Sequence, residues 1–122
     1  MKKPRHVLIV DDVHDMRSLL KTTLFQFDVK NITEAATGQK ALELYFEEGH
    51  DVVFLDINLP DISGLEVLER LLERNSRVHV VMVSGEASAE NVKEALGKGA
   101  KGFVVKPYSP AKIKAALDRF GA

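Results

Sequence analysis

The sequence predicts an α/β fold in which a five-stranded parallel sheet is covered by five helices. Five short apolar segments each end in polar or turn-forming residues, as strands buried on both faces do. Segments with a helical apolar period separate these runs. Because strands joined through single helices pair in parallel with right-handed crossovers, we expect a doubly wound sandwich.

The composition is that of one soluble globular domain, which we expect to span residues 1–122. Apolar residues make up 45% of the chain and charged residues 29%. No apolar run is long enough for a membrane helix, and we expect no signal peptide. The chain has no cysteine, which excludes disulfides, thiolate metal ligands and a cysteine nucleophile and fits a cytoplasmic location. The net charge of −1 argues against general nucleic-acid binding.

The expected elements alternate along the whole chain. We place strands at 6–10, 29–36, 51–56, 77–83 and 102–105, with the second strand at an edge. We place helices at 13–27, 37–49, 65–72, 88–98 and 110–120. Asp12 is the expected N-cap of the first helix and Ser109 that of the last. Glu66 and Arg70 should pair on the third helix.

Polar residues follow four of the five expected strands. Asp11 and Asp12 follow the first strand, Asp56 ends the third, Ser84 follows the fourth, and Lys106 follows the fifth. In the flavodoxin-like strand order 2-1-3-4-5, the first and third strands are neighbours at the switch point where such sheets bind ligands. We therefore expect these side chains to converge on one edge of the sheet.

This group of residues suits a divalent cation and a phosphoryl group. Clustered carboxylates repel one another unless a cation neutralises them, and Mg²⁺ is held by carboxylates, water and phosphate oxygens. An aspartate can carry a covalent phosphoryl group, while Lys106 and Ser84 can contact its oxygens. The chain lacks a phosphate-binding Gly-rich loop, so a nucleotide is not the expected phosphodonor.

The chain resembles the receiver domains of two-component response regulators over essentially its full length, and the stand-alone chemotaxis type in its size. The residues that carry the resemblance, in matching order and spacing, are Asp11-Asp12, Asp56, Ser84 and Lys106-Pro107. The resemblance implies that Asp56 accepts a phosphoryl group from a phosphohistidine of a sensor histidine kinase or a histidine phosphotransfer protein. It implies that Mg²⁺ is bound by Asp12, Asp56 and the backbone carbonyl of Asn58, with Asp11 acting mainly through water.

The resemblance also assigns a conformational switch. Ser84 occupies the position of the family's switch hydroxyl, and Phe103 that of its switch aromatic residue. The Lys106–Pro107 peptide bond is expected to be cis, as is typical of the family. Asn58 and Glu86 occupy positions that tune phosphate lifetime in the family.

Two positions depart from the family pattern. Gly85 stands where the family favours Ala, which loosens the backbone beside the phosphoryl site. Phe103 has no hydroxyl, so its switching can depend only on packing.

The charge distribution suggests an output surface. Residues 93–119 carry seven Lys or Arg against two acidic residues, a net charge of +5, which leaves −6 for the rest of the chain. We expect the face formed by the fourth helix, fifth strand and fifth helix to bind an acidic output protein or effector domain. The domain itself is expected to be a monomer or a phosphorylation-dependent dimer, without direct nucleic-acid or membrane binding.

Other functions fit the sequence less well. A haloacid-dehalogenase-type phosphatase also uses a strand-end Asp nucleophile with Mg²⁺, but its second Asp, two residues later, is here Asn58. A flavin-binding module would have a hydroxyl-rich phosphate loop after the first strand. An unphosphorylated pseudo-receiver would normally have lost a site residue, and none is lost. The chain's histidines lack ligand spacing, so we expect them at the surface or beside strands with no metal role; they are His6, His14, His50 and His79.

Overall fold

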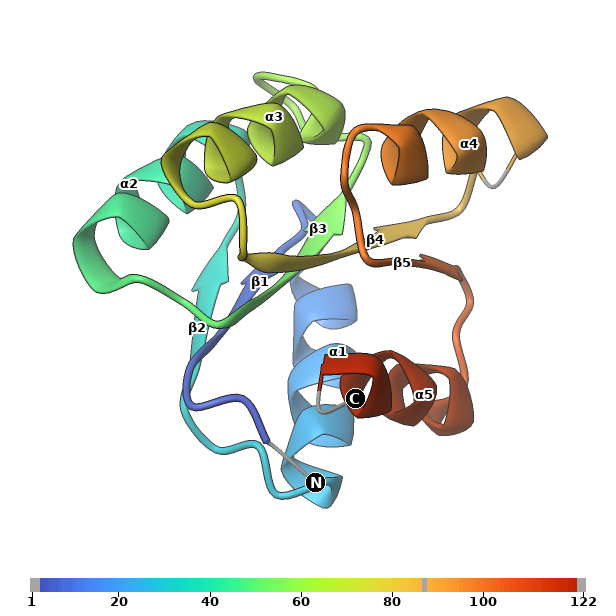
Figure 1. Ribbon diagram of the computed structural model, residues 1–122. Coiled ribbons are helices and arrows are strands. Elements are labelled where there is room, and N and C mark those ends of the chain that lie inside the picture. Colours follow the sequence, from blue (N-terminus) through green and yellow to red (C-terminus); the bar gives the residue numbers. More distant parts are fainter. Residues whose placement is uncertain (1–2, 87, 121–122) are drawn as a thin grey trace.

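The computed structural model describes residues 3–86 and 88–120, which contain five strands and five helices in strict alternation (Figure 1). The strands are β1 (Val7–Val10), β2 (Ile32–Ala35), β3 (Val52–Asp56), β4 (His79–Ser84) and β5 (Gly102–Val105). The helices are α1 (His14–Gln26), α2 (Gly38–Glu48), α3 (Gly64–Arg74), α4 (Ala89–Gly97) and α5 (Pro110–Phe120). All ten expected elements are present, with ends that differ from the expected ones by a few residues.

The strands form one parallel sheet in the order β2-β1-β3-β4-β5. This order confirms the flavodoxin-like prediction and places the half-buried β2 at an edge. The register pairs Val10 with Leu55, Asp56 with Val83, and Ser84 with Val105. The carboxyl ends of β1, β3, β4 and β5 therefore lie side by side.

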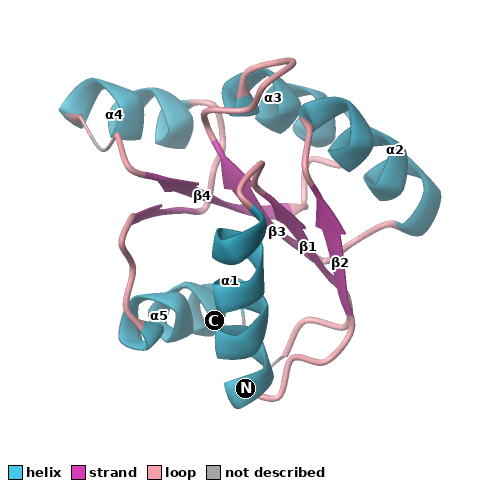
Figure 2. Cartoon of the chain, turned by 180° about the vertical axis from the view of Figure 1, so that it is seen from behind, coloured by secondary structure: helices cyan, strands magenta, loops and turns pink. Residues whose placement is uncertain are grey.

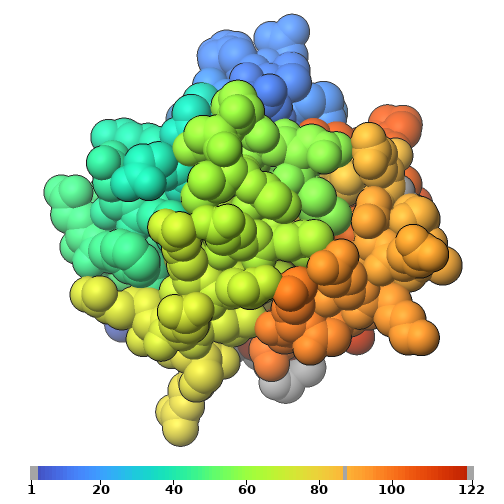
Figure 3. Space-filling view, turned by 90° about the horizontal axis from the view of Figure 1, so that it is seen from above, coloured from blue at the N-terminus to red at the C-terminus, as the bar shows by residue number. Residues whose placement is uncertain are grey.

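The helices form two layers on opposite faces of the sheet. Helices α2, α3 and α4 cover one face and α1 and α5 cover the other, which Figures 1 and 2 show from opposite sides. Figure 3 looks down on the first layer, where α3 lies between α2 and α4.

Each inner strand contributes alternate residues to two separate cores. In β3, Val53 and Leu55 pack beneath α2, α3 and α4, whereas Val52 and Phe54 pack against α1 and α5. Because both faces are covered, β1, β3 and β4 are apolar and buried over nearly their whole length. This rigid apolar sheet fixes the positions of the polar residues at its carboxyl edge.

The helix ends follow local sequence signals in most cases. Thr37 and Ser88 cap α2 and α4, and α2 ends at Gly49, whose φ of 69° is in the left-handed region. Ser109 accepts a hydrogen bond from the Lys112 N–H at 3.3 Å, as the predicted cap of α5 should. The predicted ion pair between Glu66 and Arg70 is present, with 2.6 Å between the Glu66 carboxylate and the Arg70 guanidinium.

The predicted cap of α1 is wrong. Val13 stands at the N-cap, and its side chain makes no capping hydrogen bond. Asp11 instead accepts a hydrogen bond from the Val13 N–H at 2.9 Å. A turn closed by Asp11 therefore separates β1 from α1, and Asp12 lies exposed within this turn.

Candidate functional site

The polar residues at the strand ends meet around one lysine. The Lys106 Nζ atom lies 2.5 Å from Oδ2 of Asp11 and 3.0 Å from Oδ2 of Asp56. Asp12 joins them, because carboxylate oxygens of the three aspartates lie within 4.8 Å of one another. Asp11 and Asp56 are each only 6% exposed, whereas Asp12 is open to solvent. The arrangement is a cluster of three carboxylates around one ammonium group, which is called the acidic pocket below.

Burial and charge shift the ionisation of this cluster in opposing ways. Burial raises the pKa of Asp56, and this effect outweighs the stabilisation of the carboxylate by Lys106 and by the Asn58 N–H. Burial alone would lower the pKa of Lys106, but its hydrogen bonds to Asp11 and Asp56 dominate and raise it. Lys106 is therefore charged at neutral pH, and Asp56 is a more basic carboxylate than a free aspartate.

The loop after β3 holds Asp56 in place. The Asn58 N–H donates to Oδ1 of Asp56 at 3.1 Å, which leaves Oδ2 toward Lys106. The Gly64 N–H donates to the carbonyl of Ile57 at 2.7 Å. A Cβ atom on Gly64 would clash with the backbone oxygen of Asp56, so only glycine allows the start of α3 to approach this closely.

Ser84 lies at the end of β4 beside Lys106. Its side chain is fully buried, and its Oγ accepts a hydrogen bond from the Glu86 N–H at 3.1 Å. Its carbonyl accepts from the Lys106 N–H at 2.9 Å, which couples the ends of β4 and β5. The Lys106–Pro107 peptide bond is cis, as the resemblance implied.

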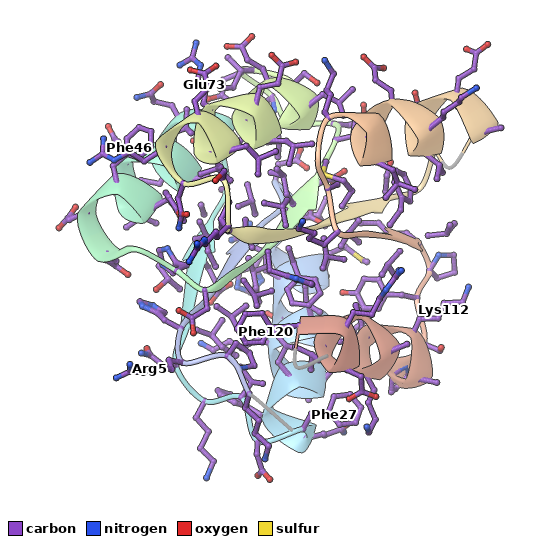
Figure 4. The ribbon with its side chains drawn as sticks, in the orientation of Figure 1. Arg5, Phe27, Phe46, Glu73, Lys112 and Phe120 are labelled. Atoms are coloured by element: carbon purple, nitrogen blue, oxygen red, sulfur yellow. The ribbon has the colours of Figure 1, made fainter. Side chains whose placement is uncertain are left out.

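Phe103 is half-buried against the core beneath α2, α3 and α4. It also lines a hollow of about 240 Å³ between β5 and α5, whose basic lining residues are Lys101, Lys112 and Arg119. Lys98, by contrast, is paired with Glu69 of α3 at 2.6 Å. The expected basic face is therefore concentrated around this hollow, and Figure 4 shows Lys112 on its α5 side.

Two side chains that the sequence did not point to support the acidic pocket, one from α1 and one from the loop before α5. The Arg17 guanidinium donates to the carbonyl of Asp11 at 2.7 Å and also pairs with Glu34 at 3.2 Å. The Tyr108 hydroxyl donates to the carbonyl of Met16 at 3.2 Å. Burial, assisted by the charge of Asp11, raises the pKa of Tyr108 to about 12. The only sequence signal for Tyr108 is its position two residues after Lys106.

The donor set of the pocket fits a hard divalent cation. Three carboxylates and one ammonium leave an excess of two negative charges in a partly desolvated site. Oxygen atoms are the ligands that Mg²⁺ prefers, and one face of the cluster is open through Asp12. The residues present therefore fit Mg²⁺.

The histidines are not scattered as expected. His14 is exposed, but His50 and His79 are buried. The rings of His6 and His50 lie 4.2 Å apart, and both approach Glu48. The expectation that the histidines lack a ligand arrangement is wrong for this pair, because β1 and β3 are neighbours in the sheet.

Comparisons with known proteins agree with the fold. Residues 7–118 match the family described as the response regulator receiver domain. The chain is 35% identical over 113 residues to the chemotaxis protein CheY of Listeria monocytogenes, covering 93% of this chain and 95% of that protein. It is 32% identical over 115 residues to CheY of Thermotoga maritima, covering 94% and 96%.

Solved structures show the same relationship. A CheY-like receiver domain protein from Methanospirillum hungatei superposes with a TM-score of 0.84 at 33% identity, covering 96% of each chain. The BeF3-activated receiver domain of DrrB gives a TM-score of 0.86 at 28% identity, covering 98% of this chain and 97% of that one.

The chain belongs to the response regulator receiver domain family. It is a CheY-like signalling domain of the two-component type, which is consistent with phosphoacceptor signalling. Within residues 3–86 and 88–120, no helix is both long and apolar enough to cross a membrane.

Proposed function

We propose that Asp56 accepts a phosphoryl group from a phosphohistidine of a sensor histidine kinase or a histidine phosphotransfer protein. The observation that carries this proposal is the Lys106 ammonium held between Asp11 and Asp56, with Asp12 completing the acidic cluster. We further propose that residues 1–122 form one receiver domain that acts in the cytoplasm as a monomer or a phosphorylation-dependent dimer.

The side chains of the pocket divide the transfer among them. An Oδ atom of Asp56 attacks the phosphorus, the P–N bond breaks, and the donor imidazole leaves with the electron pair and takes up a proton. The Asn58 N–H fixes Oδ1 of Asp56, and Oδ2 faces Lys106. As the phosphoryl group is transferred, the Lys106 ammonium leaves the Asp56 oxygen and pairs with a phosphoryl oxygen instead. The same pocket hydrolyses the acyl phosphate slowly, at a rate that Asn58 and Glu86 tune through water access.

Mg²⁺ is the proposed cofactor. Asp12, Asp56 and the backbone carbonyl of Asn58 would hold it directly, and Asp11 mainly through water. When bound, the ion would neutralise charge on the phosphoryl oxygens, which is the main requirement of phosphoryl transfer.

We propose that Ser84 and Phe103 transmit the modification. The buried Ser84 hydroxyl is the nearest side-chain donor of β4 to the pocket, and in the present structure its Oγ accepts from Glu86. Turning this hydroxyl to donate to a phosphoryl oxygen would draw the end of β4 inward. Phe103 would then repack, and the basic hollow that it lines would change shape.

The output partner is proposed to present an acidic surface to this hollow. Lys101 and Lys112 flank it, and neither is paired with an acidic residue in the part of the chain that the structure describes. Reversing both charges with Lys101→Glu and Lys112→Glu should weaken partner binding and its dependence on salt. Lys30→Glu, on an exposed loop before the edge strand β2, should leave both unchanged.

The decisive experiment is intact-mass measurement after incubation with acetyl phosphate and Mg²⁺. We expect one added phosphoryl group on the wild type and none on Asp56→Asn. An unmodified wild type, or an equal gain in Asp56→Asn, would contradict the assignment. Multiple turnover of external phosphomonoesters would instead favour a phosphatase, the alternative that Asn58 argues against.

A further inference from the structure

A second group of ligand-type side chains lies at the amino ends of β1 and β3, opposite the acidic pocket. His6 precedes β1, His50 stands two residues before β3, and Glu48 ends α2. The Asp51 N–H donates to the carbonyl of His6 at 2.9 Å and holds the two strand starts together. Figure 4 marks this end of the molecule by Arg5, the residue before His6.

The three side chains converge on one point. Nε2 of His6 lies 3.3 Å and Nε2 of His50 lies 3.2 Å from the same atom, Oε1 of Glu48. The ligand atoms of the three residues all lie within 4.8 Å of one another. A tetrahedral zinc ion with bonds of about 2.0–2.1 Å places neighbouring ligand atoms about 3.3 Å apart. Two of the three ligand separations already have this value.

His50 gives independent support, because its imidazole is buried without a hydrogen bond. The side chain is 0% exposed, and within the described residues neither ring nitrogen has a hydrogen-bond partner. Burying a polar group in this way is costly unless something binds it.

An ion pair alone does not account for this geometry. A hydrogen bond to Glu48 would require the Nε2–H of His50 to point at Oε1, and despite the 3.2 Å distance this alignment is not met. If Nε2 of His50 binds a metal, its lone pair points at the metal and not at Oε1 of Glu48, which is a neighbouring ligand atom. The poor alignment of Nε2 with Oε1 is then expected.

Only one local contact must change for an ion to bind. The Thr33 hydroxyl donates to Oε1 of Glu48 at 3.1 Å and so accepts from Nε2 of His6 at 2.6 Å. His6 would transfer its ring proton to Nδ1 to free Nε2, while Thr33 would keep its bond to Glu48. A hydroxyl that orients a ligand carboxylate in this way is a usual outer partner of a metal site.

We propose that His6, Glu48 and His50 form a binding site for a transition metal ion of the zinc type, with water as the fourth ligand. Two imidazoles and a carboxylate suit Zn²⁺ and not Mg²⁺, which prefers oxygen ligands. The partly exposed side chains of His6 and Glu48 provide the route of entry. The site clamps the starts of two central strands to the end of α2.

The test is a Zn²⁺ titration of the full chain in saturating Mg²⁺, followed by calorimetry and by NMR of the imidazole nitrogens. We expect one equivalent of Zn²⁺ to bind, with shifts of Nε2 in both His6 and His50 and a higher Tm. Glu48→Gln and His6→Gln, both at accessible positions, should bind Zn²⁺ at least tenfold more weakly.

Two matched variants serve as controls, because each changes an exposed residue of the same type outside the cluster. Glu47→Gln and His14→Gln should bind Zn²⁺ as the wild type does. Equal affinity in all five proteins would place the ion elsewhere, such as in the acidic pocket, and would overturn the proposal. So would unchanged Nε2 signals of His6 and His50 at saturating Zn²⁺.

Discussion

The Nζ atom of Lys106 lies within hydrogen-bond distance of both Asp11 and Asp56, so a single ammonium bridges the ends of β1 and β3. The lysine follows directly after β5, which is not a neighbour of either strand in the sheet. Two buried carboxylates are thus neutralised in part by a side chain that reaches across the end of β4. The fold's stability is tied in this way to the chemistry of its pocket.

Replacing Lys106 with methionine should destabilise the Mg²⁺-free protein by about 2 kcal/mol or more, because it leaves two buried carboxylates facing each other. Adding Mg²⁺ should recover more stability in Lys106→Met than in the wild type. Urea denaturation with and without Mg²⁺ measures both effects. Lys112→Met removes an exposed charge outside the pocket and should change stability by less than about 0.5 kcal/mol. Equal urea midpoints for Lys106→Met and the wild type would show that the bridge contributes nothing.

Asp12 offers the cleanest test of metal binding, because it is exposed and does not cap α1. Asp12→Asn should lower Mg²⁺ affinity at least tenfold while leaving the urea midpoint of the Mg²⁺-free protein unchanged or slightly higher. The variant removes one of three mutually repelling carboxylates. Isothermal titration with Mg²⁺ provides the measurement, and Asp15→Asn on the first turn of α1 provides the control. An unchanged Mg²⁺ affinity in Asp12→Asn would remove this residue from the proposed ligand set.

The sequence was sufficient to predict the strand order and the meeting of Asp11, Asp56 and Lys106. Buried parallel strands have continuous apolar runs, and a polar residue that ends such a run marks the carboxyl edge of the sheet. This rule located Asp56 after Val52–Leu55. It needs no knowledge of side-chain contacts, since the sheet alone fixes where the strand ends lie.

Contacts between distant loops could not be predicted in the same way. Asp61 accepts hydrogen bonds from the N–H groups of Gly38 and Gln39, at 2.9 and 2.8 Å, and so caps α2 from the loop after β3. These two hydrogen bonds lower the pKa of Asp61, and the bond from the Gln39 N–H has the larger effect. The approach of His50 to His6 likewise depends on strand pairing and on the path of the loop after α2. Neither contact leaves a local sequence signal.

Gly64 should be the least replaceable glycine near the pocket. A Cβ atom there would meet backbone atoms of Asp56 and Ile57, which cannot yield as a flexible side chain would. We expect Gly64→Ala to cost about 3 kcal/mol or more and to slow phosphorylation of Asp56. Gly97→Ala, at the end of α4 with no atom within 4 Å of the new Cβ, should be neutral or stabilising by about 0.5–1 kcal/mol. Thermal unfolding and acetyl phosphate uptake would separate the two, and equal stability of both variants would show that the contact relaxes easily.

His79 should make the fold sensitive to mild acid. Its side chain is buried at the start of β4, where its ring packs edge-on against Phe120 at 5.5 Å. Burial, with the nearby charges of Lys101 and Arg119, lowers the pKa of His79 below its ordinary value of 6.5. The folded state therefore binds fewer protons than the unfolded state, and stability falls as the pH drops through about 6.5.

Replacing His79 with leucine should flatten this dependence. A single group contributes a slope of up to about 1.4 kcal/mol per pH unit, and His79→Leu should lose this contribution between about pH 7 and pH 5. His14 is exposed, so His14→Leu should keep the wild-type slope. Urea denaturation across this pH range measures the difference. If His79→Leu and the wild type lose stability in parallel on acidification, then His79 takes up its proton in the folded protein as readily as in the unfolded chain.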